Sequence, residues 1–243
     1  MLVTGGSRGI GAAACRLFAR AGAAVAIGYR TRRERAEAVL ADCAALADEP
    51  HLAVAADLSE AAGVAALFAR LREAWDRLDH LVNNAGIWER NPIAELDPER
   101  YAETLRVNLS GPFLCTREAL PLLAASPAPS IVNVASTSGQ RGEPFYSPYS
   151  ASKGALVAAT KAWASELAPR VRVNAVAPGW VDTEMCEEPF AGGGREEIAA
   201  EIPLGRVAAP EDVAGPIVFL CSSLARHVTG AVLDVNGGSV LAG

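Results

Sequence analysis

Long apolar runs and paired metal ligands are both missing from this sequence of 243 residues. No 18 consecutive residues are apolar, which argues against a helix that crosses a bilayer. The five cysteines are scattered without a C-x-x-C pair, and the three histidines lie far apart. We therefore expect reduced thiols, no disulfide framework and no metal site. The chain opens without a basic or long apolar stretch, so we expect no signal peptide and a cytoplasmic protein.

Positive charge is also scarce. The sequence has 22 basic against 28 acidic residues, and this net charge of −6 argues against nucleic-acid binding as its main role. Only Lys153 and Lys161 are lysines; the other basic residues are arginines. Because 51% of the residues are apolar, the chain can bury the core of one large domain covering residues 1–243.

Short aliphatic runs alternate with alanine-rich helical patterns along the whole chain. The strands are predicted at 2–4, 24–29, 52–55, 81–83, 131–135, 171–176 and 232–235. The helices are predicted at about 10–21, 33–47, 60–76, 98–125, 149–168 and 210–224. This alternation predicts an α/β fold, a doubly wound parallel sheet of seven strands with helices on both faces. Residues 184–205, rich in glutamate and glycine, are predicted to form a lid over a substrate.

A glycine-rich turn joins the first predicted strand to the first helix. It reads Thr4-Gly5-Gly6-Ser7-Arg8-Gly9-Ile10-Gly11. Glycine lets the backbone approach a pyrophosphate, and the following helix N-terminus attracts the anion, so this context predicts a Rossmann nucleotide site. The alternative is an ordinary strand–helix turn. The cofactor contacts expected here are Gly5, Ser7, Arg8, Gly9, Ile10 and Gly11.

The end of the second strand suggests which nucleotide binds. An NAD site usually presents a carboxylate at this point, whereas this sequence has Tyr29 and Arg30, with Arg8 on the glycine turn. Two guanidinium groups suit the 2′-phosphate of NADP(H), which we favour over NAD(H). Alternatively, Arg30 simply belongs to the solvated start of a helix. Asp57, after the third strand, either accepts from the adenine amino group or caps the next helix.

Tyr149 and Lys153 are four residues apart at the start of a predicted helix. This spacing places both on one face, with about 6 Å of axial rise between them. A phenol is a poor base at neutral pH, but a neighbouring cation stabilises the phenolate and lowers its pKa. The pair is thus a candidate for proton transfer, although such pairs are also common on helix surfaces.

Further motifs accompany this pair. They are Asn83-Asn84-Ala85-Gly86, Asn108-Leu109-Ser110-Gly111, Ser136 thirteen residues before Tyr149, and 178–183 with the sequence Pro-Gly-Trp-Val-Asp-Thr. With the glycine turn, they resemble the short-chain dehydrogenase/reductase family over essentially the whole chain. The C-terminal motifs at 203–206, 210–213 and 236–238 resemble its 3-oxoacyl-acyl-carrier-protein reductase branch.

The resemblance implies roles for individual residues. Tyr149 would be the general acid in carbonyl reduction and the base in alcohol oxidation, and Lys153 would lower its pKa and hold the nicotinamide ribose. Ser136 would bind the substrate oxygen, and Asn108 would link Lys153 to a water relay. Further cofactor contacts would be Leu58, Asn84, Ala85, Gly86, Pro178, Gly179, Val181 and Thr183. Ser138, Trp180 and Phe190 would lie toward the substrate.

Three functions remain open. The first is NADPH-dependent reduction of a 3-oxoacyl thioester, with acyl carrier protein as a possible partner. Residues 124–130 carry none of the positive charge expected for that acidic partner, although Arg170 and Arg172 follow later. The second is oxidoreduction of a free sugar, steroid or other secondary alcohol or ketone, which the acidic lid favours. The third, a non-catalytic NADP-sensing protein, is disfavoured because the catalytic set is complete.

The resemblance also implies a homotetramer. Its interface would use the helices at 98–125 and 149–168, whose alanine-rich faces permit close helix–helix approach. Burial within one chain would explain the same alanines.

Overall fold

In the computed structural model, which describes residues 1–242, the seven predicted strands form one parallel sheet. Its strand order is β3-β2-β1-β4-β5-β6-β7. The strands are β1 (Leu2–Thr4), β2 (Ala26–Tyr29), β3 (Leu52–Ala55), β4 (His80–Asn83), β5 (Ser130–Val134), β6 (Arg172–Pro178) and β7 (Val232–Val235). The predicted sheet is therefore confirmed.

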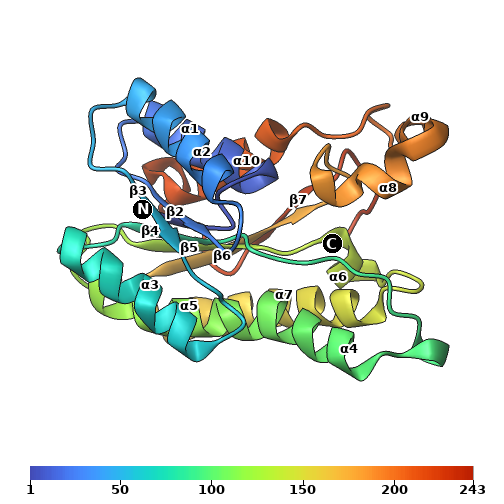
Figure 1. Ribbon diagram of the computed structural model, residues 1–243, viewed down its shortest axis with the longest axis horizontal. Helices are drawn as coiled ribbons and strands as arrows, with labels where there is room; N and C mark the ends of the chain where they lie inside the picture. Colours follow the sequence, from blue (N-terminus) through green and yellow to red (C-terminus); the bar gives the residue numbers. More distant parts are fainter. Residues whose placement is uncertain (243) are drawn as a thin grey trace.

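Helices cover both faces of this sheet (Figure 1). One layer holds α1 (Gly9–Arg20), α2 (Arg33–Leu46) and α10 (Pro210–Cys221). The other holds α3 (Ala61–Ala74), α4 (Pro98–Leu105), α5 (Gly111–Leu123) and α7 (Ser147–Glu166). Among residues 1–242, no helix is both long and apolar enough to span a bilayer.

Alternate strand residues supply the two cores. Val3 and Val132 pack under the α1, α2 and α10 layer, whereas Leu2 and Ile131 pack against α3, α5 and α7. Since side chains of a strand alternate between faces, one short apolar strand feeds both cores. This is why the strands read as continuous apolar runs rather than as alternating patterns.

The helix predicted at 98–125 is the clearest correction. It is divided into α4 and α5 by a π-helical turn, η2 (Arg106–Ser110). A π turn widens the helix by one residue, which re-aims the side chains it contains. Such a local widening leaves no signature in the spacing of apolar residues, so the sequence pattern reads as one helix.

The predicted lid segment is more regular than its glycine content indicates. It contains η3 (Glu184–Cys186), α8 (Glu187–Phe190), η4 (Ala191–Gly193) and α9 (Gly194–Glu201). These short helices lie beyond the end of β6, over the carboxyl edge of the sheet (Figure 1). Three short elements outside this segment were also not predicted: α6 (Thr137–Arg141), η1 (Ile93–Glu95) and η5 (Ser223–Ala225).

A buried polar ladder joins β4 and β5 to the helices beneath them. Asn83 and Asn133 are register partners, and Asn83 Nδ2 donates to Asn133 Oδ1 at 2.9 Å. Asn133 Nδ2 in turn donates to Thr160 Oγ1 at 2.9 Å, and Asn83 Nδ2 also reaches Thr116 Oγ1 at 3.3 Å. The ladder fixes α5 and α7 against the strands whose ends carry the loops of the site.

Asn133→Ala is expected to destabilise the fold. It leaves the buried Asn83 amide with only its longer bond to Thr116, and the buried Thr160 hydroxyl with only its bond to the Leu156 carbonyl oxygen, which costs about 2 kcal/mol. Urea denaturation should show this loss, whereas Glu49→Ala, at an exposed loop position, should change stability by less than about 0.5 kcal/mol. Equal stability of both variants would contradict the structural role of the ladder.

Candidate active site

A cleft of about 530 Å³ opens at the carboxyl edge of the sheet. It is lined by the loops that follow β1, β2, β3, β4, β5 and β6. Strand order reverses at β1, which pairs with β2 on one side and β4 on the other. In open α/β sheets this reversal leaves a crevice in which ligands bind.

The glycine turn forms one wall of the cleft. Gly5 has φ +65°, and a Cβ there would lie 2.9 Å from the Cα of Ala85. A Cβ on Gly11 would lie only 2.3 Å from the carbonyl oxygen of Gly5, so helix α1 packs directly on the turn. Both positions therefore require glycine.

The N-terminus of α1 suits an anion. Arg8 precedes the helix without making a side-chain cap, and residues from Ser7 to Ile10 line the cleft. The first backbone N–H groups of a helix lack internal partners and carry partial positive charge. The glycine turn and this helix end thus fit a dinucleotide pyrophosphate.

Asn84 ties the glycine turn to the end of β4. Its Nδ2 donates to the carbonyl oxygens of Thr4, at 2.9 Å, and Gly5, at 3.1 Å. Thr4 Oγ1 accepts from the backbone N–H groups of Asn84 and Ala85 at 3.0 and 3.1 Å. These reciprocal bonds hold the two walls of the cleft at a fixed spacing.

Tyr29, Arg30 and Asp57 also line the cleft. Arg30 pairs with Glu103 of α4 at 3.3 Å, and both side chains are partly exposed. Asp57 Oδ1 accepts from the backbone N–H of Ser59 at 2.9 Å and from its hydroxyl at 2.7 Å. These bonds lower the pKa of Asp57 and keep its carboxylate charged beside the cleft.

Glu184 of the lid segment is shared by two arginines. Its carboxylate pairs with Arg8 of the glycine turn at 2.8 Å and with Arg35 of α2. These ion pairs join the segment after β6 to the glycine turn and to α2.

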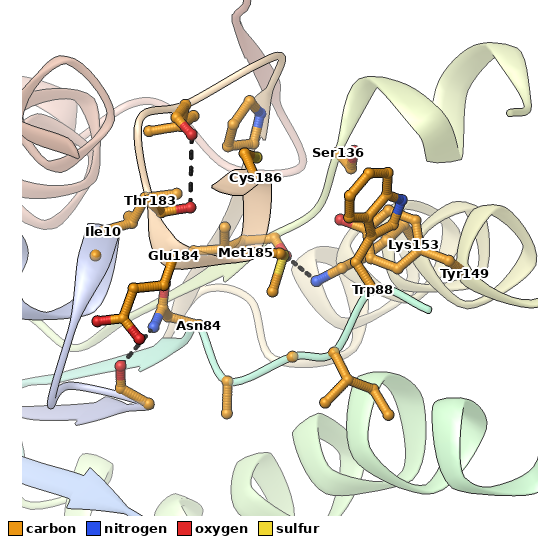
Figure 2. A pocket seen from close by; sticks show the side chains of 18 of the residues that line it. Ile10, Asn84, Trp88, Ser136, Tyr149, Lys153, Thr183, Glu184, Met185 and Cys186 are labelled. Carbon is orange, nitrogen blue, oxygen red and sulfur yellow. Dashed lines mark hydrogen bonds between the residues drawn. The ribbon is translucent and has the colours of Figure 1, made fainter. Parts of the chain in front are cut away.

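Ser136, Tyr149 and Lys153 meet at the other end of the cleft (Figure 2). Ser136 lies two residues after β5 and caps α6, while Tyr149 and Lys153 lie on the first turns of α7. Both α7 side chains are buried, and Lys153 Nζ donates to the carbonyl oxygen of Val134 at 2.7 Å. The ammonium lies 5.8 Å from the centre of the Tyr149 ring. The predicted i, i+4 placement on one face is thus correct.

Burial dominates the ionisation of this pair. It raises the pKa of the Tyr149 hydroxyl to about 12, with hydrogen bonding to Ser136 acting in the opposite direction and the Glu143 carboxylate adding to the rise. Burial also lowers the pKa of Lys153 to about 8. The direction at Tyr149 is opposite to the one expected from a neighbouring lysine. Loss of hydration is the largest influence on Tyr149, and the Lys153 ammonium donates to the carbonyl oxygen of Val134.

Asn108 lies in the π turn and is fully buried. Its Nδ2 donates to the carbonyl oxygen of Ile87 at 2.8 Å, and its Oδ1 accepts from the backbone N–H of Ile87 at 2.8 Å. Asn108 thereby fixes the loop after β4. It does not line the cleft, and no direct hydrogen bond to Lys153 occurs within residues 1–242.

The residues expected near the substrate divide into two groups. Trp180 and Ser138 line the cleft, but the Ser138 hydroxyl already donates to Glu143 Oε2 at 2.5 Å. Phe190 lies outside the lining and packs against Trp180 with ring centres 5.9 Å apart.

The cleft brings together nearly all of the other predicted residues. These are Gly5, Ser7, Arg8, Gly9, Ile10, Tyr29, Arg30, Asp57, Leu58, Asn84, Ala85, Gly86, Ser136, Tyr149, Lys153, Pro178, Gly179, Val181 and Thr183. Gly11 supports the wall from behind.

Sequence reasoning missed Trp88 and Glu143, and it covered Met185 and Ile202 only as part of the predicted lid 184–205; all four line the cleft. Trp88 is two residues beyond the Asn84-Ala85-Gly86 motif, so its position carried a usable signal. Glu143 and Ile202 belong to no spacing pattern, and only the folded chain brings them to the site.

Comparison with known proteins agrees with this geometry. A family model described as "Enoyl-(Acyl carrier protein) reductase" matches residues 5–239. A 3-oxoacyl-[acyl-carrier-protein] reductase of Synechocystis is 39% identical, over 99% of this chain and 96% of its own.

Two solved structures from Brucella melitensis are also similar. A short-chain dehydrogenase/reductase titled glucose/ribitol dehydrogenase has a TM-score of 0.91 and 35% identity, over 99% of this chain and 96% of its own. A 3-ketoacyl-(acyl-carrier-protein) reductase complexed with NADH has a TM-score of 0.89 and 36% identity, over 99% and 97%. The family match, the full-length relatives and the nucleotide cleft lead to one conclusion: this chain belongs to the short-chain dehydrogenase/reductase family of oxidoreductases.

Proposed function

We propose that this chain is a single-domain NADP(H)-dependent oxidoreductase that interconverts a carbonyl group and a secondary alcohol. The observation that carries this proposal is the presence of Ser136, Tyr149 and Lys153 in the same cleft as the glycine turn. One end of the cleft suits a dinucleotide, and the other end holds a proton donor beside a hydroxyl and an ammonium.

The bound nicotinamide would supply or accept the hydride. Tyr149, kept protonated at neutral pH by its burial, donates a proton to the carbonyl oxygen during reduction. Ser136 hydrogen-bonds the same oxygen and stabilises the charge that develops there. Lys153 holds the nicotinamide ribose, and Asn108 keeps the loop after β4 in place.

A 3-oxoacyl thioester is the first substrate class we propose, because the Synechocystis relative carries that activity in its name. Acyl carrier protein would then be the partner. One of the basic residues expected to meet it has another role: Arg172 donates to the carbonyl oxygens of Leu220 and Cys221 at the C-terminal end of α10. Arg170 remains exposed.

A free polar ketone or alcohol is the second candidate. Glu187, Glu188, Glu196 and Glu197 are all exposed on the lid segment 184–205, and they would repel an acidic carrier protein. A small uncharged or cationic substrate meets no such repulsion.

Tyr149→Phe is expected to lower NADPH-dependent ketone reduction by about 10²- to 10⁴-fold, because it removes the proton donor. The assay follows loss of NADPH absorbance with a short 3-oxoacyl thioester and with free ketones. Tyr146→Phe is the matched control, since this nearby tyrosine stacks on Trp88 and lies outside the cleft lining. Full turnover by Tyr149→Phe would refute the assigned chemistry.

The direction of the reaction should set its pH dependence. Since burial raises the pKa of Tyr149, the protonated form needed for reduction persists at neutral pH. We expect kcat/KM for reduction to be nearly flat between about pH 6 and pH 7, below the pKa of Lys153 of about 8, and that for alcohol oxidation to rise with pH. A reduction rate that falls with a midpoint near neutrality would contradict a buried, protonated Tyr149.

Arg30→Ala tests the preference for NADP(H). Loss of a charge-assisted bond to the 2′-phosphate should lower kcat/KM for NADPH by about 10- to 100-fold while that for NADH changes little. Arg33→Ala is the control, because Arg33 pairs with Glu37 on the exposed surface of α2 and does not line the cleft. Equal losses with both cofactors, or a wild type that prefers NADH, would show that Arg30 does not select NADP(H).

The homotetramer remains part of the proposal. Ala151, Ala158 and Ala162 are exposed along α7, and Phe113 of α5 is 46% exposed. Light scattering should give four times the chain mass of 25.2 kDa, and Ala158→Arg should produce smaller particles. A wild type that scatters as a monomer at micromolar concentration would exclude this assembly.

A further inference from the structure

The cleft holds a carboxylate that the proposed chemistry does not use. Glu143, two residues beyond α6, lines the cleft, and its Oε2 accepts from Ser138 Oγ at 2.5 Å and from Trp88 Nε1 at 3.2 Å. Its other oxygen, Oε1, has no hydrogen-bond partner within residues 1–242. Nor does Glu143 form an ion pair with any residue of that range.

Aromatic packing holds this carboxylate in place. Trp88 stacks on Tyr146 with ring centres 4.4 Å apart, and it meets the edge of Trp180 at 5.9 Å. An indole held on two sides cannot easily turn its N–H away from Glu143. The carboxylate is therefore preorganised to accept a further hydrogen bond, as expected of a group that binds a ligand.

Glu143 also lies next to the reacting groups. Ser138, which bonds Glu143 through its hydroxyl, donates its backbone N–H to Ser136 Oγ at 3.1 Å. The charge of Glu143 is close enough to contribute to the raised pKa of Tyr149. Ser138 thus links the Glu143 carboxylate to Ser136, the residue assigned to bind the substrate oxygen.

We propose that Glu143 is a specificity residue that binds a hydrogen-bond donor, a hydroxyl or an ammonium, on the carbon adjacent to the reacting one. The inference rests on the proposed oxidoreductase function and names its substrate class: vicinal diols or amino alcohols and the corresponding ketones. Arg141 and Glu201 are two further charged residues that line the cleft, and both are exposed.

A 3-oxoacyl thioester does not match this site. The carbons on either side of its ketone carry no hydroxyl or amino group, so no donor at that position would meet Glu143. Desolvation of Glu143 Oε1 without a hydrogen-bond partner penalises a substrate that lacks the donor. The structure therefore favours the free polar substrate over the thioester.

The test compares three alcohols that differ in one group: 2-butanol, 1,2-propanediol and 1-amino-2-propanol. Each loses a hydride from its secondary carbinol carbon to NADP⁺ and its hydroxyl proton to the ionised form of Tyr149, which then releases the proton to solvent, giving a ketone, NADPH and a proton. For the wild type, we expect kcat/KM for the diol and the amino alcohol to exceed that for 2-butanol by about 10-fold or more.

Two variants separate charge from hydrogen bonding. Glu143→Gln keeps an acceptor but loses the charge, so it should retain preference for the diol and lose preference for the amino alcohol. Glu143→Leu should reduce both ratios to 2-butanol by about 10-fold. Glu187→Gln is the control, because Glu187 is an exposed lid carboxylate outside the cleft lining.

The failures are distinguishable. If the wild type oxidises 2-butanol as well as the other two alcohols, or if Glu143→Leu lowers all three rates alike, Glu143 does not select the substrate, and the oxidoreductase function stands. If the wild type oxidises none of them and reduces neither ketone nor thioester with NADPH, both proposals are overturned.

Discussion

The site depends on the close approach of the glycine turn to the loop after β4. A side chain at Gly11 would collide with the Gly5 carbonyl oxygen, and one at Gly5 would collide with Ala85. Asn84 and Thr4 close this contact with four hydrogen bonds between the two segments. The same contact places the N-terminus of α1 at the cleft. The backbone conformation that packs β1 against α1 is therefore also the one that suits a nucleotide.

Desolvation sets the chemistry at the other end of the cleft. Tyr149 and Lys153 are both buried, and burial disfavours the charged form of each. In the proposed reaction, a phenol that stays protonated at neutral pH would serve as the acid for carbonyl reduction without first having to take up a proton. Hydrogen bonding to Ser136 lowers the pKa of Tyr149, whereas the Glu143 carboxylate raises it. The side chains around Tyr149 therefore also influence its protonation.

The sequence predicted the sheet because each strand is a short apolar run followed by a helix, a pattern tied directly to burial on both faces. It predicted which residues of the glycine turn and of the strand ends lie together, because glycines at a turn and polar residues at strand ends have few alternative uses there. It could not predict the π turn around Asn108, which changes a helix by one residue, nor the pKa direction at Tyr149, which depends on how much water the fold excludes. Glu143 was beyond prediction for another reason: its contact with Trp88 joins residues 55 positions apart in the chain.

The most direct test of the central claim is the fate of the hydride. The protein is incubated with a ketone and NADPH that carries deuterium at both C4 positions of the nicotinamide, and the product alcohol is analysed by mass spectrometry. The account predicts one deuterium on the carbinol carbon and a hydroxyl proton drawn from solvent. Product without cofactor deuterium on that carbon, or no product with any ketone or thioester while NADPH binds normally, would contradict it.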